Sequence, residues 1–188
     1  MEAFLVSTAV VALSEIGDKT QLLALMLAAR LRQPLPIILG IFVATLFNHT
    51  LAGLVGAWVR TVVPLHYLRW LIAASFFVVA LWALKPDRVG SEPAARSRWG
   101  AFAVTVVSFF LAETGDKTQI ATVVLAAQFD NLVAVVAGTT LGMLLADIPA
   151  VLLGNVASTR VPIRLVRYAA AVLFAVLGVV ALLTPIPS

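Results

Sequence analysis

Long apolar stretches, separated by short polar or proline-containing breaks, run through almost the whole chain. The pattern predicts six helices, over residues 2–29, 35–60, 67–84, 100–128, 131–156 and 164–184. The breaks fall where proline or clustered charge ends a helix, at Arg30–Pro34, Val63–Pro64, Lys85–Pro86 and Val161–Pro162. Several stretches reach the roughly 20 residues that an α-helix needs to cross about 30 Å of hydrocarbon. We therefore expect an all-α integral membrane protein.

Composition supports the same conclusion. Hydrophobic residues make up 62% of the 188 residues and charged residues only 12%, whereas a soluble domain carries about 25% charged residues. The absence of cysteine excludes disulfides and zinc-thiolate sites. The net charge of +4 is attributed to loop residues that orient a membrane protein, and we expect no nucleic-acid partner. The first apolar run lacks a basic leader, so we interpret it as a retained helix.

The two halves of the chain repeat each other. SEIGDKTQ begins at residue 14 and AETGDKTQ at residue 112, an offset of 112 − 14 = 98 residues. The same offset superimposes Gly40 on Gly138, Gly56 on Gly154 and Val63–Pro64 on Val161–Pro162. These helical glycines favour close helix packing. We predict a three-helix repeat at residues 1–84, a polar cytoplasmic linker at 85–99 and a second three-helix repeat at 100–188.

An odd number of helices per repeat implies that the second repeat enters the membrane from the opposite side. Basic residues test this, because they concentrate in cytoplasmic loops. One side of the membrane, reached after the first, third and fifth helices, holds Arg30, Arg32, Lys85, Arg88, Arg96, Arg98, Arg160, Arg164 and Arg167. The opposite side holds only Arg60 and Arg69. We predict inverted repeats with both termini on the non-cytoplasmic side, the architecture of many secondary transporters.

Six charged residues lie inside the first and fourth apolar stretches, at Glu15, Asp18, Lys19, Glu113, Asp116 and Lys117. A charge at the bilayer centre costs at least about 2.5–3.5 kcal/mol, so these residues require pairing or a function. In a continuous helix, Ser14 would share one polar stripe with the neighbouring acids. Glutamate and lysine four residues apart could then form a salt bridge along each helix. Gly17 and Gly115 would remove side-chain bulk beside the acids.

Facing repeats would bring the four carboxylates, Glu15, Asp18, Glu113 and Asp116, together near the membrane midplane. Oxygen ligands without sulfur suit Ca²⁺, Mn²⁺ or Mg²⁺, and protonation of crowded acids would compete with the metal. The alternative is that each carboxylate only neutralises a neighbouring lysine. Gln21 and Gln119 could complete the coordination shell, or could instead hydrogen-bond one helix to another.

Further polar residues lie at membrane depth. Thr20 and Thr118 follow the lysines and could add hydroxyl oxygens or bond back to the helix. Asn48 and His49 lie in the second helix, and Asp147 lies at the position equivalent to His49 in the fifth. These three residues could form a proton relay or gate, because histidine titrates near neutral pH. A hydrogen-bonded packing role is the alternative.

The two motifs resemble the paired E-x-G-D-[KR]-[TS] signature of the GDT1-like family of cation/proton exchangers. The resemblance covers essentially the whole chain and implies export of Mn²⁺ or Ca²⁺ from the cytosol in exchange for protons. It assigns the cation to Glu15, Asp18, Glu113 and Asp116, with Lys19, Thr20, Lys117 and Thr118 completing the signatures. The cations would be substrates, with no prosthetic group, and the location would be a bacterial-type plasma membrane.

Other functions stay open at this point. A proton-coupled exporter of small organic cations or amino acids would use the acids to bind an ammonium group. A membrane-embedded metal-dependent enzyme is a further alternative, although no HExxH or GxSxG signature is present. A passive channel is a third, although paired inverted sites favour a carrier. Mn²⁺ and Ca²⁺ are both open as the transported cation, and a homo-oligomer is open as well.

Overall fold

The computed structural model describes residues 1–84, 100–153 and 163–183, and every regular element within these ranges is an α-helix. The helices are α1 (Glu2–Glu15), α2 (Lys19–Leu31), α3 (Pro34–Val62), α4 (Leu65–Ala83), α5 (Gly100–Glu113), α6 (Lys117–Gln128), α7 (Leu132–Leu153) and α8 (Ile163–Leu183). The all-α prediction is confirmed for these residues. The predicted linker at 85–99 and the predicted match at Gly154 lie outside the described residues.

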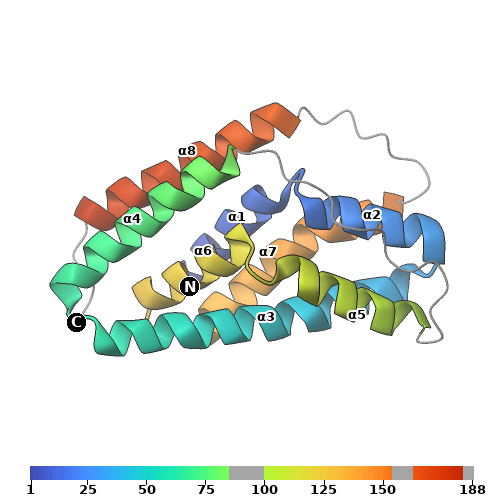
Figure 1. Ribbon diagram of the computed structural model, residues 1–188, viewed down its shortest axis with the longest axis horizontal. Coiled ribbons are helices and arrows are strands. Elements are labelled where there is room, and N and C mark those ends of the chain that lie inside the picture. The colour runs from blue at the N-terminus through green and yellow to red at the C-terminus, as the bar shows by residue number, and fades with distance from the viewer. Residues whose placement is uncertain (85–99, 154–162, 184–188) are drawn as a thin grey trace.

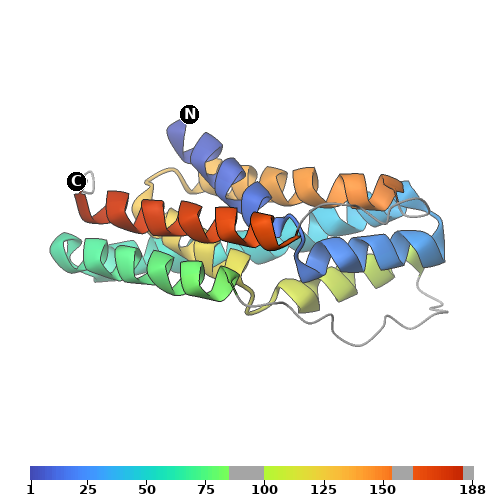
Figure 2. The same cartoon turned by 90° about the horizontal axis from the view of Figure 1, so that it is seen from above.

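The helices run mainly along the long axis of the molecule (Figure 1). The pair α1 and α2 runs from left to right, α3 returns, and α4 runs to the right again. The pair α5 and α6 then runs from right to left, so it points opposite to α1 and α2, its equivalents in the repeated sequence. In the view from above, α4 and α8 lie side by side as an antiparallel pair (Figure 2).

Two predicted helices, 2–29 and 100–128, are each broken at the repeated motif. The first is divided into α1 and α2, and the second into α5 and α6. Gly17 and Gly115 adopt φ values of +79° and +80°, a left-handed conformation that glycine reaches without steric penalty. A Cβ atom at Gly115 would meet nothing within 4 Å. The expectation that Gly115 removes side-chain bulk is therefore wrong, because backbone conformation requires the glycine there.

Close helix contacts hold the two repeats together. The principal partners of α3 are α5, α6 and α7, while α1 packs on α7 and α4 on α8. A Cβ atom at Gly40 would lie 2.7 Å from Thr105 Cβ of α5, and one at Gly138 would lie 2.5 Å from the Phe4 carbonyl oxygen of α1. These equivalent glycines bring equivalent helices into contact, which confirms the packing role predicted for them.

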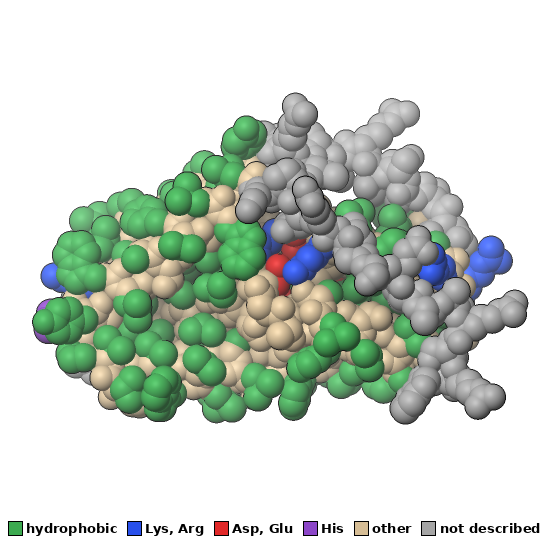
Figure 3. All heavy atoms as spheres, in the orientation of Figure 1, with side chains coloured by type: hydrophobic (Ala, Val, Ile, Leu, Met, Phe, Trp, Pro, Cys, Tyr) green, Lys and Arg blue, Asp and Glu red, His purple; other side chains and the backbone are tan. Residues whose placement is uncertain are grey.

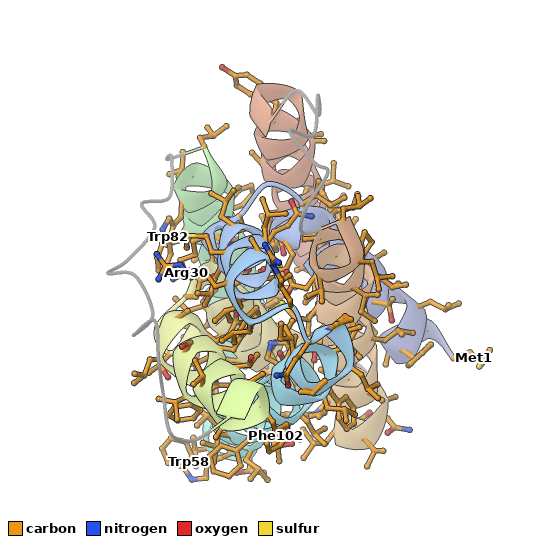
Figure 4. The ribbon with its side chains drawn as sticks, turned by 90° about the vertical axis from the view of Figure 1, so that its right-hand side faces the viewer. Met1, Arg30, Trp58, Trp82 and Phe102 are labelled. Atoms are coloured by element: carbon orange, nitrogen blue, oxygen red, sulfur yellow. The ribbon has the colours of Figure 1, made fainter. Side chains whose placement is uncertain are left out.

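The outer surface suits an apolar solvent. On the face shown in Figure 3, hydrophobic side chains cover much of the described surface, acidic side chains appear at mid-length, and basic side chains appear there and at both ends. Met1, Trp58 and Phe102 point outward from the bundle (Figure 4). Among the described residues, α3 and α7 are long and apolar enough to cross a membrane. The first and fourth predicted spans do not pass that criterion because each is divided into half-helices of 12 to 14 residues.

The left-handed backbone at Gly115 generates a stability prediction. We expect Gly115→Ala to lower the free energy of unfolding by about 1–2 kcal/mol, the cost of placing an L side chain in that conformation. Gly115→Asn should cost less, because asparagine tolerates the left-handed region better than alanine. Thermal unfolding of the purified protein in detergent would rank the variants. Equal stability of wild type and Gly115→Ala would contradict the strain argument.

Candidate cation site

The two helix breaks meet at the centre of the molecule and bring acidic side chains together. Asp18 and Asp116 occupy the N-cap positions of α2 and α6 with extended backbones. One carboxylate oxygen from each of Glu15, Asp18 and Asp116 lies within 4.8 Å of the other two. All three residues are buried, at 0–1% exposure. The positive N-terminal ends of two half-helices therefore lie beside a compact carboxylate cluster.

Both motif lysines form ion pairs with the opposite repeat. Lys19 Nζ lies 2.7 Å from Asp116 Oδ1, and Lys117 Nζ lies 2.8 Å from Asp18 Oδ1. The salt bridges considered along each helix, from Glu15 to Lys19 and from Glu113 to Lys117, are absent from the ion pairs of the described residues. Their premise was wrong, because the helix breaks between the two residues and each lysine reaches an aspartate of the other repeat.

Both motif threonines interact with the glutamates. Thr20 Oγ1 donates a hydrogen bond to Glu15 Oε2. Thr118 Oγ1 lies 3.3 Å from both Glu113 Oε2 and Asp116 Oδ2. One carboxylate oxygen of each glutamate, Oε1, is buried without a hydrogen-bond partner among the described residues. An unpaired buried carboxylate oxygen is unfavourable unless a cation or proton satisfies it.

The two glutamines stabilise the breaks. Gln21 Oε1 accepts a hydrogen bond from the Gly17 backbone N–H at 2.9 Å, and Gln119 Oε1 accepts one from Gly115 at 2.7 Å. Gln21 Nε2 also donates to the carbonyl oxygen of Ala146 in α7 at 3.0 Å. Their oxygens thus satisfy backbone groups that the break releases. A metal-ligand role for either glutamine stays a prediction.

Ser14 does not share a polar stripe with the acids, since no single helix spans the motif. Its hydroxyl group donates to the Val11 carbonyl oxygen at 3.0 Å within α1. The residue is buried, at 3% exposure. In the described structure, the Ser14 hydroxyl group therefore hydrogen-bonds within its own helix. Its supporting role in the motif stays a prediction.

Glu113 is not one of the three residues whose carboxylate oxygens lie within 4.8 Å of one another. Its Oε2 atom is 3.9 Å from His49 Nε2, and both side chains are fully buried. Asn48 Nδ2 donates to the Phe110 carbonyl oxygen at 3.1 Å, which ties α3 to α5. The structure thus places the second-helix polar pair beside Glu113. The hydrogen bond from Asn48 to α5 fits a packing role for that residue. The relay role of His49 stays a prediction.

Asp147 is the fifth buried acid. Neither of its carboxylate oxygens has a hydrogen-bond partner among the described residues. It lies within electrostatic range of both Glu15 and Glu113. Since 49 + 98 = 147, it occupies the position that His49 holds in the first repeat. The two halves of the site therefore differ chemically at equivalent places.

Comparison with known proteins gives matches along nearly the whole chain. The profile of a family described as "Divalent cation/proton antiporter GDT1" matches residues 3–91 and 101–187. A Vibrio cholerae protein named "Putative manganese exporter" is 48% identical over 175 residues, which cover 93% of this chain and 87% of that protein. GDT1-like protein sll0615 of Synechocystis is 28% identical over 207 residues, which cover 99% of each chain. No solved structure matches the chain.

The glutamine contacts give a matched pair of variants. Gln21 makes hydrogen bonds to Gly17 and to Ala146 of α7, whereas the contact found for Gln119 is the one to Gly115. We expect Gln21→Ala to destabilise the protein by about 1 kcal/mol more than Gln119→Ala, the usual net value of one hydrogen bond. Thermal unfolding in detergent provides the comparison. A larger loss in Gln119→Ala would contradict the assignment.

Proposed function

The chain belongs to the GDT1 family of divalent cation/proton antiporters, and we propose that it exports Mn²⁺ from the cytosol in exchange for protons. The family is one of transporters, not enzymes, and its cations are substrates, not prosthetic groups. The observation that carries the proposal is the buried cluster of Glu15, Asp18 and Asp116, with carboxylate oxygens within 4.8 Å of one another. Such a cluster requires positive charge to be stable.

The ligand chemistry supports a hard divalent cation. Carboxylate oxygens suit Mn²⁺, Mg²⁺ and Ca²⁺, whereas softer metals prefer sulfur or imidazole ligands. Manganese is our first choice because the Vibrio cholerae relative carries that metal in its name. Calcium is the second candidate, since the family description covers divalent cations in general. Glu113 lies outside the cluster and would join the coordination shell only if the site contracts around the ion.

Proton exchange is supported by the same charges. When the cation leaves, the carboxylates repel one another in a poorly solvated environment, and binding of protons relieves that repulsion. His49 of α3 lies 3.9 Å from Glu113, and Asp147 of α7 is within electrostatic range of both glutamates. We propose that they relay or gate the protons. Because His49 is an imidazole and Asp147 is a carboxylic acid, the two repeats would differ in how they bind and release a proton.

We also propose six membrane spans arranged as two inverted repeats, at residues 1–84 and 100–188, joined by a cytoplasmic linker at 85–99. Support comes from the 98-residue offset, from the opposite directions of α1–α2 and α5–α6 (Figure 1), and from the separate family matches in each half. Both termini would lie on the non-cytoplasmic side of a bacterial inner membrane. Alternating access would then move one repeat against the other.

Transport into proteoliposomes tests the function. With an imposed pH gradient, we expect wild-type protein to move Mn²⁺ against opposing proton flux reported by an internal pH dye. Glu15→Gln, Asp18→Asn and Asp116→Asn should each abolish transport, because each removes a charge from the cluster. Glu2→Gln is the control, since Glu2 is exposed at the start of α1. Absence of Mn²⁺ and Ca²⁺ movement in wild type would overturn the proposal, and full activity of Glu15→Gln would remove that residue from the site.

The absence of cysteine makes the topology easy to test. Single cysteines at Glu2 and Tyr67 should react with a membrane-impermeant maleimide added to intact spheroplasts, because the proposed topology puts both positions outside. A cysteine at Gln33 should react only after the membrane is opened. All three side chains are exposed in the structure, so burial does not explain a lack of labelling. Labelling of Gln33→Cys in intact spheroplasts would contradict the proposed orientation.

A further inference from the structure

We propose that Lys19 and Lys117 are tethered cations that occupy the transport site when no metal is bound, and that a divalent cation binds by displacing them. The inference rests on the proposed cation transport and adds a competitor that the protein itself carries. It assigns the two lysines a role in setting metal affinity. The alternative is that they only neutralise buried charge as fixed structural partners.

The geometry places the ammonium groups on the cluster itself. Lys117 Nζ contacts Asp18 at 2.8 Å, and Lys19 Nζ contacts Asp116 at 2.7 Å. Both aspartates belong to the three residues whose carboxylate oxygens could hold one ion. A metal ion at those oxygens would therefore have two ammonium groups as close neighbours. Like charges at that separation repel strongly away from bulk water, so the metal and the ammonium groups compete for the aspartates.

The lysine side chain is suited to leaving. It carries its charge as a compact ammonium group on a flexible four-carbon stem, unlike the rigid, planar fork of arginine. Lys19 is 24% exposed and has room to withdraw, whereas Lys117 is only 5% exposed. We infer that Lys117 is the stronger competitor, because its charge is the more fully removed from solvent.

The pairs also connect the two repeats. Each lysine stands at the first position of one half-helix, α2 or α6, and contacts the N-cap aspartate of the other. Both links therefore cross between the repeats, and a metal that displaces both lysines removes both links at once. A metal bound to Asp18 and Asp116 would itself bridge the repeats, so binding of the substrate would exchange two ion pairs for one shared ion between them. Without metal, the lysines would hold them together.

Calorimetric titration of the purified protein with MnCl₂ separates competition from a structural role. If Lys117 competes with the metal, Lys117→Met should bind Mn²⁺ about tenfold more tightly than wild type, a change equivalent to one modest charge interaction. Lys117→Arg retains the charge and should bind less tightly than Lys117→Met. In proteoliposomes, Lys117→Met should show a lower half-saturating Mn²⁺ concentration together with a lower maximal rate.

Two further variants make the test decisive. Lys19→Met should shift affinity in the same direction but by less, and Arg69→Met, at an exposed position in α4, should leave it unchanged. If Lys117→Met does not fold, as size-exclusion chromatography would reveal, Lys19→Met decides the question. Unchanged or weaker Mn²⁺ binding in a folded lysine variant, with normal wild-type binding, would overturn the competitor role alone. Failure of wild type to bind or transport Mn²⁺ and Ca²⁺ would overturn the proposed function and this inference together.

Discussion

Gly17 and Gly115 turn the backbone out of its helix in the middle of each repeat, and the contacts at the site depend on that turn. If either helix continued, aspartate and lysine would follow glutamate around a single cylinder. The turn instead makes each aspartate the N-cap of a new half-helix and directs the next residue, lysine, towards the opposite repeat. The carboxylate cluster and both ion pairs are consequences of two residues with positive φ.

Breaking a helix inside a membrane is costly unless the released backbone groups find partners. At each break, a glutamine oxygen accepts the glycine N–H, and the aspartate N–H bonds to the glutamate carbonyl oxygen at 3.0 Å. The threonine hydroxyl then interacts with the glutamate side chain. The consecutive residues of the motif therefore serve separate requirements: the turn, the cap, the cross-repeat charge and the hydrogen bonds that stabilise them.

The sequence predicts much of the fold but only part of this site. The apolar stretches locate the helical segments of the described residues, apart from the two breaks, and the 98-residue offset identifies the equivalent residues of the two halves. Local spacing cannot reveal that Lys19 pairs with Asp116, because that contact joins residues 97 positions apart, 116 − 19. One signal for the break was present in the sequence. Glycine is a poor helix former and aspartate a favoured N-cap, so glycine followed by aspartate inside an apolar run indicates a new helix start.

The differences between the repeats matter as much as their likeness. Two identical inverted halves would give inward-facing and outward-facing states of equal energy, since a two-fold rotation about an axis in the membrane plane would convert one state into the other. In this chain, His49 Nε2 lies 3.9 Å from Glu113 Oε2, whereas its equivalent, Asp147, is a fully buried acid within electrostatic range of both Glu15 and Glu113. Because the imidazole next to Glu113 has an acid as its counterpart in the other repeat, the two glutamates are unequal in their demand for positive charge. In the proposed exchange cycle, that inequality would bias which state holds the metal and which holds protons, because a ligand shifts an equilibrium only by its difference in affinity for the two states.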